Sequence, residues 1–352
     1  MKDGFGREIS YMRVSITDKC NLRCIYCAGC VEQPGCAADP GTEGRHFPES
    51  SGAELSPGRH FPESSGAELS PAELEEIVEA AVSLEIRKIR ITGGEPLVRP
   101  EVLEICERIH GIPGVEELTL TTNGVLFQQY ADKLKKAGVS RVNISLDTLR
   151  RDRYHAVTGG DIQAVFRGIR AAWEAGLVPV KINVVLMKGV NEDEIDSFVE
   201  LARTEPVEVR FIELMPMTGG NSWEVQHFLS GEEVLAKAPG LIPIEAGSHR
   251  ACDVTKGSVA RLYRHPGGVG RVGLIRPVSS HFCPSCNRIR LTSDGHIRSC
   301  LHFEEEIDIY HLHGVELSEA LKRAILRKPM EHENLRQGKA GGSGRSMNRI
   351  GG

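Results

Sequence analysis

Short apolar segments alternate with amphipathic segments from Arg13 to about residue 214. The apolar segments are rich in Ile, Val, Leu and Thr, and most are apolar enough to be buried on both faces, as parallel strands are. We predict strands over Arg13–Thr17, Lys88–Gly93, Glu117–Asn123, Arg141–Asp147, Val180–Leu186 and Val207–Leu214.

The amphipathic segments between these strands predict helices, and two of them carry a proline at or near the start, where a missing N–H costs little. They cover Pro71–Leu84, Pro100–His110, Phe127–Ala137, Asp161–Ala175 and Glu192–Arg203. A strand followed by a helix, repeated about six times, indicates a parallel βα barrel or a doubly wound sheet. We favour an α/β fold with an incomplete (β/α)6 TIM-type barrel, because six units fall short of the usual eight.

The regular alternation is lost after Met215. Residues 216–282 hold many glycine, proline and polar positions with short apolar runs such as Arg271–Ile275, and a late helix is expected over Ser318–Arg327. We therefore expect a barrel over residues 1–216 and an irregular C-terminal region over residues 217–352, which ends in a tail rich in Gly and Arg.

One segment of the chain is duplicated. The sequence GRHFPESSGAELSP occupies residues 44–57 and is repeated unchanged at 58–71. A perfect tandem copy indicates a duplication tolerated in a surface loop, because a solenoid would need at least three repeats. The many Gly, Pro and Ser residues predict a mobile insertion, which we place at residues 28–71.

Composition excludes several classes of protein. A net charge of −5 and a pI near 6.3 over 352 residues give no bulk electrostatic reason to expect nucleic acid or an anionic membrane as partner. The chain has no apolar run of about eighteen residues, and Met1–Ser10 does not resemble a signal peptide. Its 10 cysteines are too sparse for a disulfide scaffold. In a reducing cytoplasm, where we expect this protein, they are better explained as metal ligands.

Two sets of three cysteines carry the main chemical signal. They are Cys20, Cys24 and Cys27, spaced C-x3-C-x2-C, and Cys283, Cys286 and Cys300, spaced C-x2-C-x13-C. A cubane [4Fe–4S] cluster normally takes four thiolates, so each set would leave one iron open to a ligand that is not protein. The first set follows a predicted strand, and in a parallel barrel such loops lie at the face where active sites collect.

Zinc is the alternative for both sets, because it prefers four tetrahedral ligands. Cys30 or Cys36 could complete the first set, and His281, His296 or His302 could complete the second. Cys30 also forms a second C-x2-C, so a minor cluster held by Cys24, Cys27 and Cys30 is conceivable. Cys106 is expected to be a buried apolar residue and Cys252 a loop thiol.

The first cysteine motif, with Tyr26 before its last cysteine, resembles the radical S-adenosylmethionine superfamily. In that superfamily the open iron chelates S-adenosylmethionine, and an electron from the cluster cleaves it to methionine and a 5′-deoxyadenosyl radical. The segment Gly93-Gly94-Glu95-Pro96 resembles the superfamily's GGEP turn, whose backbone meets the methionine amino group. Paired glycines allow such a close approach of backbone to a ligand.

Further segments resemble the GTP 3′,8-cyclases of molybdenum cofactor biosynthesis, the MoaA family. They occur in the family's order and span nearly the whole chain: KIRITGGEP, LTTNG, VNISLD, VKINVV, VRFIELMP, FCPSCNRIRLTSDG and the terminal Gly-Gly. The resemblance implies a lyase that converts GTP to 3′,8-cyclo-7,8-dihydro-GTP, with two [4Fe–4S] clusters and S-adenosylmethionine. The chain departs from the family pattern after Cys27, where Ala28-Gly29-Cys30 and the duplicated segment replace a short loop.

The resemblance also implies roles for individual residues. The catalytic set would be Arg13, Cys20, Cys24, Cys27, Gly351 and Gly352, with the last two in a tail that enters the active site. S-Adenosylmethionine would contact Tyr26, Gly94, Ser145 and Met215, with Arg210 nearby. GTP would contact Arg13, Arg90, Thr121, Lys181, Arg288, Ile289 and Arg290. The first cysteine set would hold the S-adenosylmethionine cluster, and Cys283, Cys286 and Cys300 would hold the auxiliary cluster beside the guanine.

The residues themselves support an anion site. Basic residues lie within four predicted strands whose neighbours are largely apolar: Arg13, Arg90, Lys181 and Arg210. A buried cation is costly unless it is paired or faces a polar cavity. Glu208 and Glu213 could pair with Arg210, but the other three strands contain no acid, which favours a bound triphosphate over structural ion pairs. Arg288 and Arg290 alternate, so both would point to one face.

Partners follow from the resemblance as well: a reductant protein, a downstream cyclic pyranopterin monophosphate synthase and a possible homodimer. One alternative is a radical S-adenosylmethionine enzyme that modifies peptides and carries an auxiliary cluster. It predicts more C-terminal cysteines than the three seen, and the arginines after Cys286 argue against it. A non-catalytic zinc or iron–sulfur module is the alternative from another class.

Overall fold

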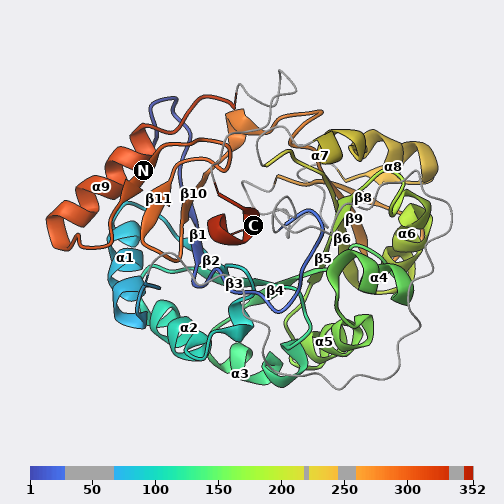
Figure 1. Cartoon of the computed structure of the whole chain (residues 1–352), viewed down its shortest axis with the longest axis horizontal. Coiled ribbons are helices and arrows are strands. Elements are labelled where there is room, and N and C mark those ends of the chain that lie inside the picture. The colour runs from blue at the N-terminus through green and yellow to red at the C-terminus, as the bar shows by residue number, and fades with distance from the viewer. Residues whose placement is uncertain (28–66, 218–221, 245–258, 333–344, 352) are drawn as a thin grey trace.

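The computed structural model describes residues 1–27, 67–217, 222–244, 259–332 and 345–351. Within them, one sheet of 12 strands runs in the order β12-β11-β10-β1-β2-β3-β4-β5-β6-β9-β8-β7. Its central strands are parallel and curve into an open arc, with helices along the outside and the C-terminus inside (Figure 1). The incomplete α/β barrel predicted from the sequence is confirmed.

The six predicted strands are present and pair in sequence order. They are β1 (Tyr11–Ser15), β2 (Lys88–Thr92), β3 (Glu117–Thr122), β4 (Arg141–Ser145), β5 (Val180–Leu186) and β6 (Val207–Glu213). Each is parallel to the next. The parallel pairing places the ends of all six strands, and the loops that follow them, at the same edge of the sheet.

The helices outside the arc match the predicted ones, with small shifts at their ends. They are α1 (Pro71–Ser83), α2 (Val102–Gly111), α3 (Ala131–Lys136) after the short turn η3 (Phe127–Gln129), α5 (Ile162–Glu174) and α6 (Ile195–Thr204) after η4 (Glu192–Glu194). A further helix, α4 (Arg151–Thr158), was not predicted, because its sequence RDRYHAVT is mostly polar. The apolar faces of these helices and the outer faces of the strands form one continuous core.

The C-terminal region extends the sheet at both edges. Strand β9 (Arg271–Ile275) runs parallel to β6, and β10 (Arg288–Leu291) runs parallel to β1. Antiparallel strands then continue outward on each side: β8 (Arg261–Arg264) and β7 (Ile242–Pro243) beyond β9, and β11 (His296–Arg298) and β12 (Glu306–Asp308) beyond β10. The remaining helices are α7 (Ser222–Gln226), α8 (Gly231–Lys237), α9 (Gly314–Leu326), which corresponds to the predicted late helix, and α11 (Met347–Ile350).

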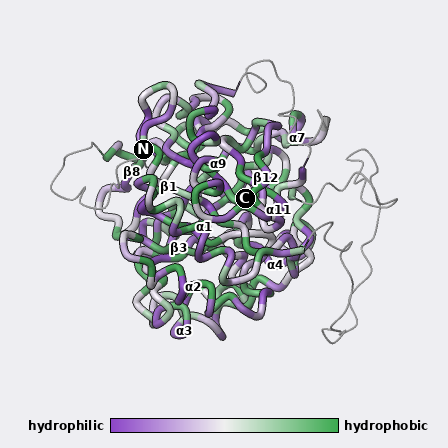
Figure 2. The backbone as a smooth tube through the Cα atoms, turned by 90° about the vertical axis from the view of Figure 1, so that its left-hand side faces the viewer, coloured by the Kyte–Doolittle hydropathy of each residue, from purple (hydrophilic) through white to green (hydrophobic). Residues whose placement is uncertain are grey.

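The inner face of the arc is polar. In β1, Met12 and Val14 are fully buried toward the helices, so the alternate residues Tyr11, Arg13 and Ser15 face inward. In Figure 2 green and purple alternate along the backbone, which does not separate into an apolar half and a polar half. The core therefore lies between strands and helices, and the space within the arc is left for a polar ligand.

The end of the second repeat copy belongs to the fold. Leu69 is buried, and Ser70 caps α1 through the backbone N–H of Glu73, whose own carboxylate accepts from Ser70 N–H. This reciprocal capping box satisfies two N–H groups that the helix start would otherwise leave unpaired. The first copy lies outside the described residues. No helix in the described part of the chain is long and apolar enough to cross a membrane.

Candidate active site

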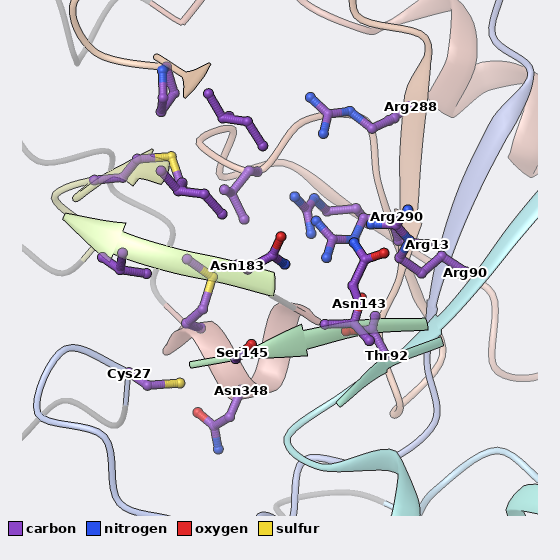
Figure 3. A pocket seen from close by; sticks show the side chains of 18 of the residues that line it. Arg13, Cys27, Arg90, Thr92, Asn143, Ser145, Asn183, Arg288, Arg290 and Asn348 are labelled. Atoms are coloured by element: carbon purple, nitrogen blue, oxygen red, sulfur yellow. The ribbon is translucent and has the colours of Figure 1, made fainter. Parts of the chain in front are cut away.

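One cavity within the arc brings together most of the residues that the sequence singled out. It is lined by both cysteine sets and by ten further predicted residues: Arg13, Tyr26, Arg90, Gly94, Thr121, Ser145, Arg210, Met215, Arg288 and Arg290. Figure 3 shows Arg13, Arg90 and Arg290 close together on one side of the cavity, with Cys27 and Ser145 on the other. The two cysteine sets are far apart in the sequence and open into the same space.

Backbone hydrogen bonds hold the first cysteine loop against the turn after β2. Gly94 N–H donates to the carbonyl of Thr17 at 2.8 Å, and Glu95 N–H donates to the carbonyl of Lys19 at 2.8 Å. A Cβ atom on Gly94 would lie 2.3 Å from the Lys19 carbonyl oxygen, so no side chain fits there. The GGEP turn therefore fixes where Cys20 lies.

Tyr26 is held by a carboxylate that the sequence analysis did not single out. Its hydroxyl donates to Asp147 Oδ2 at 2.6 Å, and the other oxygen of Asp147 accepts from Val185 N–H at 2.8 Å. Burial raises the pKa of Asp147 to about 6. Asp147 follows β4 and lines the cavity, so it ties the cysteine loop to the ends of β4 and β5.

The second cysteine set is held by two buried cations. Arg7 donates from Nη1 to the carbonyl of Cys283 at 2.8 Å, while its Nε pairs with Asp3. Lys328 Nζ donates to the carbonyls of Arg288 and Ser299, at 2.8 and 2.6 Å. Burial raises the pKa of Cys286, but Arg288 and Lys328 outweigh it and bring that pKa to about 6. These cations favour a thiolate at Cys286, whereas burial raises the pKa of Cys283.

The thiols of the first set have a different environment. Burial raises the pKa of Cys20 to about 11, and burial together with Cys27 raises the pKa of Cys24 well above its usual value. Bound iron reverses such a shift, because a metal-coordinating thiol loses its proton outright. The seven cysteines in the described residues are free thiols. The donor sets thus fit iron–sulfur clusters.

No group of three or more His, Cys, Asp or Glu side chains among the described residues gathers closely enough for a single metal ion. A cubane cluster binds each thiolate to a different iron, so its ligands stand further apart than those of one ion. Cys106 is buried within α2, as expected. Cys30, Cys36 and Cys252, and with them the alternatives that use Cys30 or Cys36, lie outside the described residues.

Three arginines lie side by side across three neighbouring strands. Arg13 on β1 is in register with Arg90 on β2 and with Arg290 on β10. Burial and then the charge of Arg290 lower the pKa of Arg13, and burial followed by Arg288 lowers that of Arg290 to about 10. Cations gathered this closely favour an anionic ligand.

Lys181 has a partner on the next strand. Its Nζ lies 3.3 Å from Glu208 Oε1, and the same carboxylate accepts from Arg210 Nε at 2.6 Å. Burial, followed by Arg210, lowers the pKa of Lys181 to about 7, although Glu208 opposes the shift. Two cations therefore share one carboxylate, and this part of the arc retains a positive charge while Lys181 is protonated. Glu213 instead accepts from the backbone N–H of Gly231, Val278 and Ser279.

A few predicted site residues lie outside the cavity lining. Lys181 is buried behind it, and Ile289 is fully buried on the opposite face of β10 from Arg288 and Arg290. The Gly351 carbonyl accepts from Arg290 Nη1 at 2.5 Å, so the tail does reach the arginines. Gly352 lies outside the described residues.

Several lining residues were missed from the sequence. Asn143 and Asn183 occupy inward positions of β4 and β5, and Asn123 follows β3. Assigning alternate residues of each predicted strand to the inner and outer faces would have identified Asn143 and Asn183. Lys328 and Asn348 gave no sequence signal, because their approach to the cavity depends on distant parts of the chain.

Three buried oxygens along the cavity have no hydrogen-bond partner among the described residues. They are Thr121 Oγ1, Asn143 Oδ1 and Asn183 Oδ1. Buried polar atoms are normally hydrogen-bonded, so such a group needs an explanation. A polar ligand within the arc would provide donors for them.

A partial parallel barrel with three cysteines in the loop after its first strand defines a radical S-adenosylmethionine enzyme. The family described as Radical SAM superfamily matches residues 14–202, and the family described as Molybdenum Cofactor Synthesis C matches residues 207–334. The chain belongs to the GTP 3′,8-cyclase family, MoaA. It is 43% identical to the GTP 3′,8-cyclase of Alkaliphilus oremlandii and 45% identical to that of Alkaliphilus metalliredigens, in each case over 100% of both chains. It is 42% identical to that of Moorella thermoacetica, over 94% of this chain and 95% of the other.

Solved structures share the fold at low sequence identity. The Streptococcus suis SuiB structure bound to S-adenosylmethionine matches 90% of this chain and 68% of its own, with a TM-score of 0.54 at 12% identity. Native anSMEcpe with bound AdoMet matches 90% of this chain and 82% of its own, with a TM-score of 0.53 at 16% identity. At these identities the similarity concerns the fold alone.

Proposed function

We propose that the chain converts GTP to 3′,8-cyclo-7,8-dihydro-GTP, as a radical S-adenosylmethionine lyase of molybdenum cofactor biosynthesis. The observation that carries this proposal is that both sets of three cysteines and a group of arginines line one cavity. Family membership over the full length of the chain agrees with it. The two [4Fe–4S] clusters supply the electron and the open coordination sites for this chemistry when they are bound.

At the first cysteine set, the protein orients S-adenosylmethionine. We infer that Cys20, Cys24 and Cys27 hold the cluster and that Gly94, Ser145 and Met215 contact the cosubstrate. The short distance between the Gly94 backbone and the cysteine loop supports this, because it brings the end of β2 next to the thiols. Tyr26 lies in the same wall, with its hydroxyl fixed by Asp147.

At the opposite side of the cavity, cations receive the triphosphate. We infer that Arg13, Arg90 and Arg290 bind phosphate oxygens, because their charges lie in register on adjacent strands and line the cavity. Arg210 and Lys181 add charge from β6 and β5 and share only one carboxylate. The unpartnered oxygen of Thr121 would accept a hydrogen bond from the nucleotide.

The remaining residues serve the guanine and its surroundings. We infer that Cys283, Cys286 and Cys300 hold the auxiliary cluster, with Arg288 beside it. Arg288 lies over the Phe282 ring at 4.9 Å, which directs its guanidinium toward the cluster loop. Ile289 would contact GTP only through its backbone, since its side chain faces the core.

The partners of this reaction follow from its chemistry. Each cleavage of S-adenosylmethionine consumes an electron, so we expect a reductant protein, and an unstable product calls for a downstream cyclic pyranopterin monophosphate synthase. We place the reaction in the cytoplasm, where GTP and reducing power are available. A homodimer is a further expectation, which sedimentation of the cluster-loaded protein would test.

The peptide-modifying alternative has less support. Native anSMEcpe has also been solved with a bound Cp18Cys peptide, and that structure resembles this chain with a TM-score of 0.52 at 15% identity, which concerns the fold alone. The adjacent arginines across β10, β1 and β2 suit a small polyanion and have no obvious use with a neutral peptide.

The decisive experiment is anaerobic. The clusters are reconstituted, dithionite, S-adenosylmethionine and GTP are added, and the small molecules are analysed by mass spectrometry. A GTP-dependent product isomeric with GTP, formed together with 5′-deoxyadenosine, is expected. Deoxyadenosine without any change in GTP would support the radical chemistry and reject GTP as the substrate. If protein with a full iron content forms neither product, the proposal is rejected for this chain.

A further inference from the structure

The C-terminal tail lies inside the barrel. Helix α11 and the C-terminus occupy the middle of the arc of strands (Figure 1), and Ile350 is fully buried. Gly351 has a φ of 74°, and a Cβ atom there would lie 2.7 Å from Thr92 Cγ2 and 3.1 Å from Ser15 Cβ. Glycine is therefore needed at this position both for its backbone conformation and for lack of space.

The hairpin of β10 and β11 contacts the tail at both of its ends. At the inner end, Arg290 on β10 donates to the carbonyl of Gly351 at 2.5 Å. At the outer end, Arg345 Nη1 lies 2.6 Å from Asp294 Oδ2, in the turn between β10 and β11, and its Nη2 lies 2.8 Å from Glu306 Oε2 on β12. The β10–β11 hairpin thus contacts both the first and the last residue of the described tail.

The two acids that receive Arg345 are themselves fixed. Asp294 accepts from the hydroxyl of Thr292 at 2.5 Å through the oxygen that Arg345 does not use. Glu306 pairs through its other oxygen with Arg298, whose side chain is fully buried. Both carboxylates are therefore also held by groups outside the tail, which lowers the entropy lost in forming the ion pairs with Arg345.

A third contact joins the tail to the first cysteine loop. Asn348 Nδ2 donates to the carbonyl of Asp18 at 3.0 Å, and Asp18 precedes Cys20 by two residues. Ser346 donates to Asn348 Oδ1 at 2.6 Å and fixes the orientation of that amide. The tail consequently bridges the cysteine loop and the arginines.

We propose that Arg345 is a positioning residue whose ion pairs with Asp294 and Glu306 set how far the C-terminal tail enters the barrel. The ion pairs of Arg345 fix the start of a short segment whose end, Gly351, must meet Arg290. A tail released at Arg345 therefore loses the contact between Gly351 and Arg290. The inference rests on the proposed function in one respect, namely that Arg290 belongs to the GTP site.

Hydrogen–deuterium exchange tests the anchor without catalysis. In the reconstituted full-length protein, amides of the C-terminal peptide that spans residues 345–352 are compared between the native sequence and Arg345→Ala. Loss of two partly buried ion pairs should speed their exchange by about tenfold. Arg345→Lys keeps the charge without the two-pronged geometry and should restore part of the protection. Arg203→Ala is the matched control, since it removes an exposed ion pair with Glu200 on α6, outside the tail.

A second readout links the tail to the reaction. Arg345→Ala should raise the ratio of 5′-deoxyadenosine to cyclised product by about tenfold, because radical formation continues while the tail no longer meets Arg290. Asp294→Asn removes one of the two partners of Arg345 and should change both readouts in the same direction. It takes the place of Arg345→Ala in the test if that variant folds poorly. Native exchange rates of the C-terminal amides in both Arg345→Ala and Asp294→Asn would overturn the proposal. If the unsubstituted protein makes no cyclised product, the proposed function fails, but the exchange experiment still decides whether Arg345 anchors the tail.

Discussion

Arg13 and Arg290 lie directly opposite each other on the parallel strands β1 and β10, although one is near the start of the chain and the other near its end. Burial and the charge of Arg290 both lower the pKa of Arg13. Two guanidinium groups in this position repel each other, and an anion between them turns the repulsion into binding energy. The pair is therefore best explained as part of a binding site.

Replacing Arg13 should weaken GTP binding. Arg13→Gln removes one charge-assisted contact, so the dissociation constant for GTP should rise by about tenfold or more. Anaerobic equilibrium binding measures this constant. Arg108→Gln, which alters exposed ion pairs with Glu75 and Glu104, should leave it unchanged. Unchanged affinity in Arg13→Gln would place the triphosphate elsewhere.

The contribution of Lys181 should depend on pH. Its pKa in the free protein is lowered to about 7 by burial and by Arg210, while Glu208 opposes the shift and Arg141 adds to it. The ammonium charge is thus present below pH 7 and lost as the pH rises above it. A bound triphosphate raises this pKa, so GTP affinity should fall with increasing pH above 7, by at most tenfold per unit.

Two variants separate this effect from the titration of GTP itself. Lys181→Met removes the ionisable group, and its affinity should be low and lack the fall above pH 7. Lys181→Arg stays charged throughout this pH range, so its GTP affinity should stay high and should not fall above pH 7. Binding measured from pH 6 to 8.5 for all three proteins gives the comparison. A native protein that follows Lys181→Met across this range would show that Lys181 carries no charge at the site.

Lys181 also shows how far the sequence could be taken. The segment VKINVVL predicts strand β5 from end to end, because its apolar residues suffice for a buried parallel strand. Its lack of an acid suggested that Lys181 had no protein partner. The structure supplies Glu208 from β6, which the register places opposite Lys181. Register between strands is set by tertiary packing, so this ion pair could not be found within one segment.

Other features depended on the same kind of information. The Arg271–Ile275 run was visible as a short apolar segment, but its parallel pairing with β6 depends on the path of the whole C-terminal region. Asp147 lies within the VNISLD segment, yet its role became visible only through the Tyr26 hydroxyl. The cysteines and arginines could be singled out from the sequence because the proposed chemistry needs particular residue types at particular spacings, whereas the residues that orient them are chosen by geometry.

A methyl group on Gly94 should disturb the first cysteine loop. In Gly94→Ala the new Cβ would lie 2.3 Å from the Lys19 carbonyl oxygen and 2.7 Å from that of Asp18, and both are backbone atoms. We expect a loss of about 1–3 kcal/mol in the free energy of unfolding and weaker binding of S-adenosylmethionine. Gly111→Ala in α2 is the control, because a Cβ there meets nothing within 4 Å. Equal stability of the two variants would mean that the loop moves freely away from the turn.

The second cysteine set should be needed for cyclisation more than for radical formation. Cys283→Ala removes one proposed ligand of the second set, while the loop that holds Cys20 is untouched. We expect about half of the iron to be lost, with 5′-deoxyadenosine still formed and the cyclised product absent. Iron content and mass spectrometry of the reaction mixture measure these outcomes.

Cys106→Ala is the matched control for this variant, since Cys106 is fully buried in α2 and contributes nothing to the cavity lining. It should keep the full iron content and the native ratio of products, at a cost of about 1 kcal/mol in stability from the small void left behind. Cyclised product from Cys283→Ala at native yield would refute the auxiliary-cluster assignment. Loss of deoxyadenosine as well would show instead that the two cysteine sets depend on each other. This is physically reasonable because the first set follows β1, Cys283 and Cys286 precede β10, and these two strands are paired.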